Sequence, residues 1–414
     1  QASQPATATA ARHTSPMRVT SSDAPPCPDP PGVLRTNKRF KPGLSTSTPT
    51  MQGHQRAMII RAMNALTAPP IPSSTPSPAN LATFVEATDG AVALTHMGII
   101  RAQGADAVKF LHGQLSNDVA LQGMSEARLA AFCSPKGRMQ ASFVYFKLAA
   151  DDVLLVCSRD LLPTVLKRLS MFVMRAQCKL SDATDQFTLW GLVGATANRW
   201  AAAAQLAPTQ WAKATLADNA ALPAGLPTPA TLVRLPSAGT GPQAVTRLLG
   251  CTPASASVQA SAANPDVWQA PALTTENWQL LSVRSAVVMV SQPVVEAFVP
   301  QMLNYESVGG VNFKKGCYPG QEVVARSQFR GTLKRRAFHV RCDAPLAVGQ
   351  DVFHSSDTEQ PCGTVAAAAP AGQGFEAVVS MLVSAAEGGV LTLGSATGPM
   401  LTVLPLPYAL LADI

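Results

Sequence analysis

One stretch of the chain, residues 313–326, gathers residue types that can do chemistry around a single cysteine. It reads FKKGCYPGQEVVAR, and Cys317 stands there between glycines and a proline that predict a tight loop. The residues from Gln321 onward have helical character, which would place the thiol near the positive end of a helix dipole. Lysine and arginine side chains add positive charge on both sides. Both effects favour the thiolate, the form that acts as a nucleophile or a metal ligand.

A packed cysteine in an ordinary Gly-Pro turn is the alternative to this interpretation. The crowding of Gly, Lys, Gln and Glu around Cys317 favours a functional loop. The chain has no C-x-x-C pair, since its closest cysteines, Cys342 and Cys362, are 20 residues apart. His96 and His112 also lack the spacing of metal ligands. The sequence therefore predicts reduced thiols and no metal site.

Composition and charge limit the class of protein. The chain has 414 residues, of which 47% are hydrophobic and 14% charged, as in a soluble globular protein with two or three domains. No uncharged apolar run approaches the roughly 18 residues of a membrane helix. Residues 1–80 hold eight Lys/Arg and two acids, so they carry +6 of the net +7. The rest of the chain is nearly neutral, and any basic patch there must be local.

The chain divides into three parts by composition. Residues 1–80 are rich in Pro, Ser and Thr and are predicted to be a disordered basic tail. Residues 81–330 mix strands and helices without a regular βαβ period, which indicates two α+β lobes. Within them, 207–272 is Pro-, Ala- and Ser-rich, with weak strands predicted at 231–235 and 243–248, and is expected to be a variable insert or an inter-lobe connection. Residues 331–414 show five short strands between Gly/Pro turns, which predict a small closed β-barrel.

The elements expected to position the chemistry follow from hydrophobic periodicity. Strands are predicted at 91–96, 99–103, 139–148, 152–157 and 187–194, and helices at 106–114, 160–175, 196–205 and 275–285. The five barrel strands are predicted at 336–342, 350–354, 363–367, 377–383 and 390–393. The fold class predicted from this pattern is α+β.

The run KKGCYPGQEVVAR at 314–326 resembles the signature of the YgfZ folate-binding family, which is related to the glycine-cleavage T-protein, an aminomethyltransferase. Further stretches match that family in order along the chain. They are residues 104–119, 133–138, 276–278, 298–301 with 309–311, and 404–408. Together these stretches span about residues 88–410 apart from 207–272.

The resemblance implies a three-lobed T-protein-like ring with a C-terminal barrel, and tetrahydrofolate or another reduced folate in its centre. It also implies a role in the assembly or repair of iron–sulfur clusters, including those of tRNA-modifying radical enzymes. The expected partners are iron–sulfur client enzymes or assembly proteins. The expected location is the cytoplasm of a bacterium, or the mitochondrial matrix if the basic N-terminal segment is a transit peptide.

A pterin ring is flat and needs an apolar or aromatic face together with hydrogen-bond partners. Trp278 matches a tryptophan that lines the folate site in the family, and Met97 stands where relatives can place an aromatic residue. The alternative for Trp278 is an anchor of its own helix in the core. The full set of cofactor-binding residues expected from the resemblance is Trp278, Met97, Lys315, Gly316, Tyr318, Gly320, Gln321, Glu322 and Arg326, with Cys317 as the functional thiol at the folate pocket.

Two departures from the T-protein pattern bear on catalysis. The acidic pair of the aminomethyltransferases is missing, and Gln140 in that stretch cannot act as a general acid or base. In the related proteins, a second segment carries a Glu that can bind the pterin. The matching segment here, residues 283–286, reads V-R-S-A, with Arg284 at its second position. Glu296 or Glu322 would have to serve as the carboxylate partner of the pterin instead.

Three functions stay open on the sequence. A folate-dependent accessory factor without catalysis of its own is favoured by the Cys317 loop, and a one-carbon transferase is the alternative. The third is an RNA-associated scaffold, because Lys and Arg residues cluster between 326 and 341 and could make a weak contact with phosphates. A solvated edge strand guarded by charge explains that cluster equally well.

Overall fold

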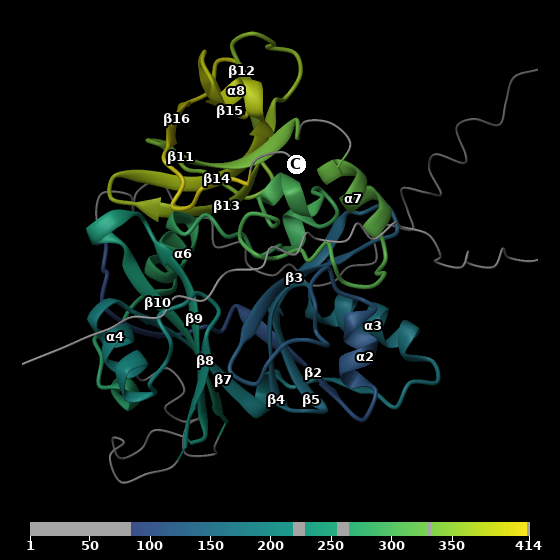
Figure 1. Cartoon of the computed structure of the whole chain (residues 1–414). Helices are drawn as coiled ribbons and strands as arrows, with labels where there is room; N and C mark the ends of the chain where they lie inside the picture. The colour runs from purple at the N-terminus through teal and green to yellow at the C-terminus, as the bar shows by residue number, and fades with distance from the viewer. Residues whose placement is uncertain (1–83, 218–227, 255–264, 330–332, 412–414) are drawn as a thin grey trace, which may run out of the picture. The chain divides into compact units, whose positions relative to one another are not determined.

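The computed structural model describes residues 84–217, 228–254, 265–329 and 333–411 (Figure 1). These residues form two five-stranded sheets and one closed six-stranded barrel, all with antiparallel pairing between neighbouring strands. The predicted α+β class with a C-terminal barrel is confirmed. The predicted tail, residues 1–80, lies outside the described residues.

The first sheet has the strand order β3-β4-β5-β2-β6. Its strands are β2 (Met97–Gln103), β3 (Ala127–Cys133), β4 (Met139–Ala149), β5 (Asp152–Ser158) and β6 (Lys179–Asp182). Helix α2 (Ala107–His112) contacts β5, and helix α3 (Leu162–Val173) contacts β2 and β6. Leu162, Val165 and Leu169 form the buried stripe of α3, at the spacing that an amphipathic helix requires.

The second sheet has the order β1-β7-β10-β9-β8. Its strands are β1 (Gly90–Ala93), β7 (Phe187–Val193), β8 (Lys213–Leu216), β9 (Ala230–Ala238) and β10 (Val245–Pro253), with helix α4 (Gly194–Ala203) beside them. Trp190 and Trp200 each meet Trp268 edge-to-face in the core of this sheet. Residues 207–272, expected to be an insert, therefore supply three strands of the sheet. Their Pro and Ala content weakens the alternation that marks a strand.

The barrel closes in the order β11-β14-β13-β12-β15-β16. Its strands are β11 (Arg335–Cys342), β12 (Asp351–His354), β13 (Gly363–Ala371), β14 (Gly374–Leu382), β15 (Leu391–Leu393) and β16 (Met400–Leu404), with helix α8 (Val383–Ala386) after β14. The sixth strand, β16, was not predicted. It pairs with both β11 and β15, and this pairing closes the barrel.

Two further helices connect these units. Helix α6 (Thr275–Arg284) contacts β9 of the second sheet and β13 and β14 of the barrel, and helix α7 (Gln321–Phe329) follows the cysteine loop. Thr274 caps α6 by accepting a hydrogen bond from the amide of Asn277. Short 3₁₀ turns lie at Thr184–Gln186, Gly241–Gln243, Pro265–Trp268, Gln292–Val294 and Pro300–Leu303.

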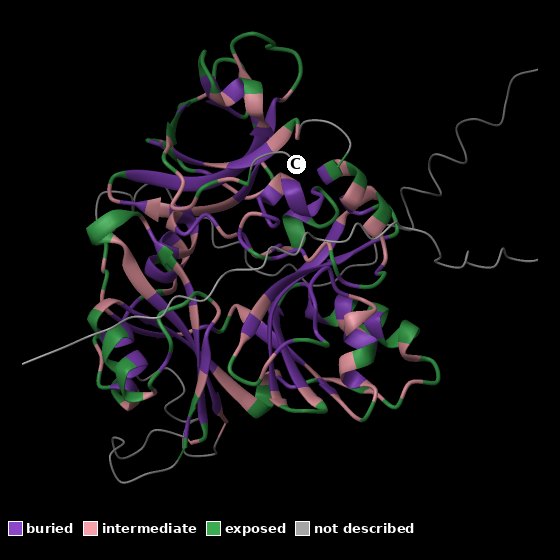
Figure 2. Ribbon diagram, in the orientation of Figure 1, coloured by how far each residue is buried: buried purple, intermediate pink, exposed green. Residues whose placement is uncertain are grey.

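Figure 2 shows buried residues along the strands of both sheets, whereas exposed residues gather on helices and loops. Among the described residues, no helix is long and apolar enough to span a membrane.

Candidate functional site

A central cavity of about 300 Å³ lies where the two sheets and the barrel meet. Each unit contributes a wall. The lining includes Met97 of β2, Val144 of β4, Val156 of β5, Leu235 of β9, Leu249 of β10 and Ala367 of β13. The walls are mostly apolar, which is the usual character of a small-molecule site, and the volume is at the lower end of the range for such sites.

Met97 and Trp278, the two residues expected to contact a pterin, both line this cavity. Trp278 is nevertheless packed into the core, with 5% of its surface exposed. A Cβ atom at Gly191 would lie 2.4 Å from Cε3 of the indole, so only glycine fits under the ring. The guanidinium of Arg247 lies over the indole, 4.5 Å from its centroid. Trp278 is thus both a core residue and part of the cavity wall.

Among the described residues that line the cavity there is no Asp or Glu. Glu296 is exposed and accepts a 2.6 Å hydrogen bond from Nε2 of Gln140, away from the cavity. Glu322 pairs with Arg326 on the surface, at 2.7 Å. Neither of the two expected substitutes therefore provides a carboxylate to the cavity.

The cysteine loop is a second candidate site, and its residues do not line the cavity. Cys317 is exposed, whereas its neighbour Lys315 is buried. The Lys315 ammonium donates to the carbonyls of His112 and Leu115 and lies 4.8 Å from the ring centroid of Tyr318. Burial lowers the pKa of Lys315 to about 8, against the opposing influence of Asp118 and Cys317. The loop thus contains a buried lysine with a pKa of about 8, two residues before an exposed thiol.

Tight backbone contact fixes the base of this loop. Gly320 has φ +79° and Gly137 has φ +71°, a region that side chains with a Cβ rarely adopt. A Cβ atom at Gly320 would lie 2.4 Å from the carbonyl oxygen of Ser134. The turn at 133–138 therefore packs directly against the loop, and the two resemblance-bearing stretches meet in space.

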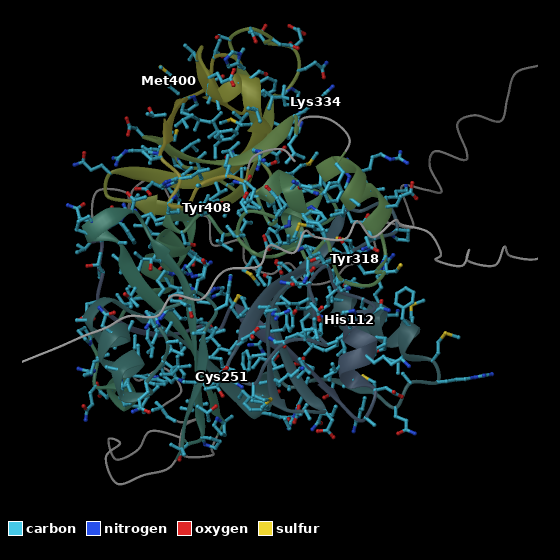
Figure 3. The ribbon with its side chains drawn as sticks, in the orientation of Figure 1. His112, Cys251, Tyr318, Lys334, Met400 and Tyr408 are labelled. Atoms are coloured by element: carbon cyan, nitrogen blue, oxygen red, sulfur yellow. The ribbon has the colours of Figure 1, made fainter. Side chains whose placement is uncertain are left out.

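A third resemblance-bearing stretch, residues 104–119, contains α2 and contacts the loop through the hydrogen bonds that Lys315 donates to His112 and Leu115. The Ser116 hydroxyl donates to the carbonyl of Gly310 and the Asn117 amide donates to that of Gly309. His112, at the end of α2, lies 3.3 Å from Asp118 through Nδ1. His112 and Tyr318 are labelled in Figure 3.

Helix α7 continues from the loop. The amide of Gln321 donates to the carbonyl of Tyr318, and the helix begins there. Arg326 stands in the last turn and forms an ion pair with Glu322. The positive charge of Arg326, which was expected to favour the Cys317 thiolate, is therefore balanced by a carboxylate of the same helix. The two side chains are 60% and 83% exposed.

The predicted site residues thus fall into two groups. Met97 and Trp278 line the central cavity, whereas the loop group does not. The loop group consists of Lys315, Gly316, Cys317, Tyr318, Gly320, Gln321, Glu322 and Arg326. Within the described chain, no group of three or more His, Cys, Asp or Glu side chains could hold a metal ion.

A groove of about 1050 Å³ is lined in part by Phe313 and Lys314, which directly precede the loop group in the chain. Trp211 lines both the cavity and this groove. The Trp211 indole N–H donates to the carbonyl of Val308. A single indole therefore belongs to the walls of both spaces.

Trp211 and Arg247 line the cavity but were not predicted as site residues. Both lie within the segment 207–272, whose composition predicted an insert or an inter-lobe connection. Arg247 nevertheless carries a signal in the sequence, because a lone arginine begins the apolar run RLLGC. An arginine at an inward-facing strand position is seldom buried without a specific role.

The basic cluster between 326 and 341 is largely engaged with other groups. Arg336 forms a buried ion pair with Glu306 at 2.7 Å, and Arg335 donates to the carbonyl of Cys362. Arg341 lies 3.8 Å from Asp343. These contacts favour a structural role for the cluster over an RNA-binding surface.

Comparison with known proteins agrees with this architecture. Residues 81–217 match the family described as "GCVT N-terminal domain". A "tRNA-modifying protein YgfZ" of Sodalis glossinidius is 29% identical over 77% of this chain and 93% of its own length. The protein of the same name from Cronobacter sakazakii is 27% identical, again over 77% of this chain and 93% of its own length.

Among solved structures, the glycine cleavage system aminomethyltransferase T from Bartonella henselae matches with a TM-score of 0.53 and 16% identity. The match covers 78% of this chain and 87% of that one. At this identity the likeness shows the fold alone. The chain therefore has the T-protein fold, its residues 81–217 match the GCVT N-terminal domain model, and its resemblance to the YgfZ proteins is confirmed.

Proposed function

We propose that this protein is a folate-binding accessory factor that supports tRNA modification by assembling or repairing iron–sulfur clusters in client enzymes. The observation that carries the proposal is the cavity walled by both sheets and the barrel, with Met97 and Trp278 in its lining. The relatives named tRNA-modifying protein YgfZ support the biological context. We further propose that it acts in the cytoplasm.

The cavity suits one part of a reduced folate better than the whole molecule. Its volume of about 300 Å³ and its apolar walls fit a flat bicyclic ring. The aminobenzoyl and glutamate portions would then extend outside. The cavity would hold the pterin between Met97, Trp278 and the aliphatic side chains of β4, β5 and β10.

The thiol serves a different purpose from the cavity in this proposal. Cys317 is exposed and lies outside the cavity lining, so a protein partner can reach it directly. An iron–sulfur client enzyme or an assembly protein would dock at the Cys317 loop while the folate occupies the cavity. Lys315 beneath the loop would stabilise negative charge on the thiol or on a group bound to it.

The alternative, a one-carbon transferase, requires an acid or base beside the folate. Among the described residues, the cavity lining contains no Asp or Glu; in the place of the acidic pair, Gln140 is engaged with Glu296 elsewhere, and His96 is the one imidazole in the lining. The accessory function is therefore favoured over the transferase.

Titration of the purified chain with tetrahydrofolate under reducing conditions tests the proposal. We expect quenching of the Trp278 fluorescence, and we expect Trp278→Ala to raise the dissociation constant roughly 5- to 150-fold through loss of an aromatic wall. Trp200→Phe is the matched control, because Trp200 lies in the core of the second sheet outside the cavity lining. A dissociation constant unchanged in Trp278→Ala would return Trp278 to a purely structural role, and no binding by the wild-type chain would refute the proposed function.

A further inference from the structure

Arg247 is a buried cation in the central cavity that has no carboxylate partner. It stands on β10 and is 4% exposed. One of its terminal nitrogens donates to the Ser282 hydroxyl at 2.6 Å and the other to the carbonyl of Pro236 at 3.3 Å. No described Asp or Glu forms an ion pair with it. A buried charge without a counter-ion is costly, so its retention in an apolar cavity calls for a specific acceptor.

Two nitrogen atoms of the cavity residues lack any partner in the protein. Nε of Arg247 and Nδ1 of His96 are both buried without a hydrogen bond, and both residues line the cavity. Burial lowers the pKa of Arg247 to about 9, so the guanidinium is charged at pH 7. Burial also lowers the pKa of His96, which favours the neutral imidazole. Arg247 Nε is therefore a buried donor among the residues that line the cavity, where a carboxylate had been expected.

The position of Arg247 also determines which edge of a bound ring would face β10. The Arg247 guanidinium, which β10 of the second sheet provides, lies over the indole of Trp278 from α6, 4.5 Å from the ring centroid. A guanidinium matches an oxygen acceptor and cannot accept from the amino group of a pterin. A ring entering the cavity would therefore turn its carbonyl edge, and not its amino edge, toward β10.

We infer that Arg247 anchors the ligand of the central cavity by donating a hydrogen bond from Nε to the ring carbonyl oxygen of a reduced pterin. The inference rests on the proposed folate-binding function and adds to it the orientation of the ring. Arg247 acts as a binding and specificity residue. It excludes flat ligands that present only donors at this wall.

The test measures binding by calorimetry with the full chain and three probes: tetrahydrofolate, 6-methyltetrahydropterin, which lacks the tail, and p-aminobenzoyl-glutamate, which lacks the ring. Arg247→Met should weaken tetrahydrofolate and 6-methyltetrahydropterin to a similar extent, roughly 10- to 100-fold for a lost charge-assisted hydrogen bond. Arg247→Lys should not restore binding, because lysine has neither the planar fork nor the Nε–H. Arg234→Met is the matched control, since Arg234 stands on the neighbouring β9, donates to Ala207 and does not line the cavity.

Melting temperatures separate binding from folding. Arg247→Lys keeps a buried cation, so it provides a second variant if Arg247→Met is unstable. Equal affinity of wild type and both variants for 6-methyltetrahydropterin would overturn the inference and leave folate binding intact. A loss confined to p-aminobenzoyl-glutamate would overturn it too, because Arg247 would then hold the tail. If the wild-type chain binds none of the probes, the proposed function itself fails, and the inference with it.

Discussion

Cys317 differs from the other cysteines of the described residues in being exposed. Replacing its thiol by a hydroxyl changes little volume, and the loop is shaped by Gly320 against Ser134. We therefore expect Cys317→Ser to keep the melting temperature and the folate affinity of the wild type. In a strain that lacks the endogenous relative, the same variant should fail to restore iron–sulfur enzyme activity, because a serine hydroxyl does not ionise at pH 7.

Cys133→Ser is the control for this variant. Cys133 is buried and burial raises the pKa of its thiol to about 12, so it is an inert packing group. Its replacement should lower stability, if it has any effect, and spare complementation at matched expression. Full rescue by Cys317→Ser would show that the exposed thiol only fills space.

Lys315 should leave a signature in the pH dependence of stability. Its pKa is about 8 in the folded protein against an ordinary 10.5, so the unfolded chain binds more protons between these values. Stability contributed by this residue therefore rises as the pH increases from 8 to 10.5. Urea unfolding should show the wild type gaining about 2 kcal/mol relative to Lys315→Met between pH 7 and pH 10. A pH-independent difference would mean that the lysine is hydrated and not buried under the loop.

At the scale of single residues, the sequence was informative where chemistry leaves a local motif. The Cys317 loop could be recognised because Gly, Pro, Lys and Cys stand together there. Trp278 and Met97 could be placed by resemblance. The separation of Cys317 from the cavity could not be predicted, because the path of residues 285–313 between α6 and the loop depends on tertiary packing.

Among the elements, α6 depends on an ion network that joins it to the barrel. Arg284, at its C-terminal end, binds Glu376 of β14 at 2.7 Å and Glu86 at 2.7 Å, and Glu376 also pairs with His339 of β11. Burial acts to raise the pKa of Glu376, but hydrogen bonds from His339 and Arg284 and their charge lower it to about 2. The position at which relatives can carry a pterin-gripping Glu is thus used here to fix a helix.

Arg284→Ala should destabilise the protein at pH 7 by about 3 kcal/mol, because it leaves a buried carboxylate with one partner fewer. The lowered pKa of Glu376 contributes stability above the ordinary carboxyl pKa and loses it as the pH falls toward 2. The difference between wild type and variant should therefore shrink in urea unfolding below about pH 4.

Arg326→Ala is the matched control, since the Arg326–Glu322 pair is exposed and should contribute about 0.5 kcal/mol or less. An equal loss for Arg284→Ala and Arg326→Ala would rule out a structural role for the network.

Elements were predictable where their periodicity is strong. The helices at 160–175 and 275–285 and three strands of the first sheet, β2, β4 and β5, were found close to their predicted bounds, whereas β3 and β6 were not predicted. The strand at 213–216 was not predicted, and only residues 231–235 of the strand at 230–238 were, since short Ala- and Pro-containing strands are defined by their neighbours in the sheet. Strand β16 was missed for a similar reason. Its Met400 and Val403 are exposed, so the strand does not show the alternation of buried and exposed residues that predicts a strand.

On the scale of the whole molecule, the resemblance and the β content of the C-terminal part predicted the architecture correctly. The division of the strands between the two sheets was not predictable. β1 pairs with β7 and not with its neighbour in sequence, β2, and such non-local pairing depends on which buried faces meet.

The three-walled cavity has a consequence for folding. Because β2, β10 and β13 belong to different units, none of the units contains a complete binding site. Any free energy released by ligand binding is then available only to the state in which all three units are assembled. The bound ligand acts as a non-covalent crosslink, which couples the melting of the barrel to that of the sheets. A ligand that binds this cavity would therefore lengthen the lifetime of the protein in the cell, since a chain without ligand has the more easily separated units.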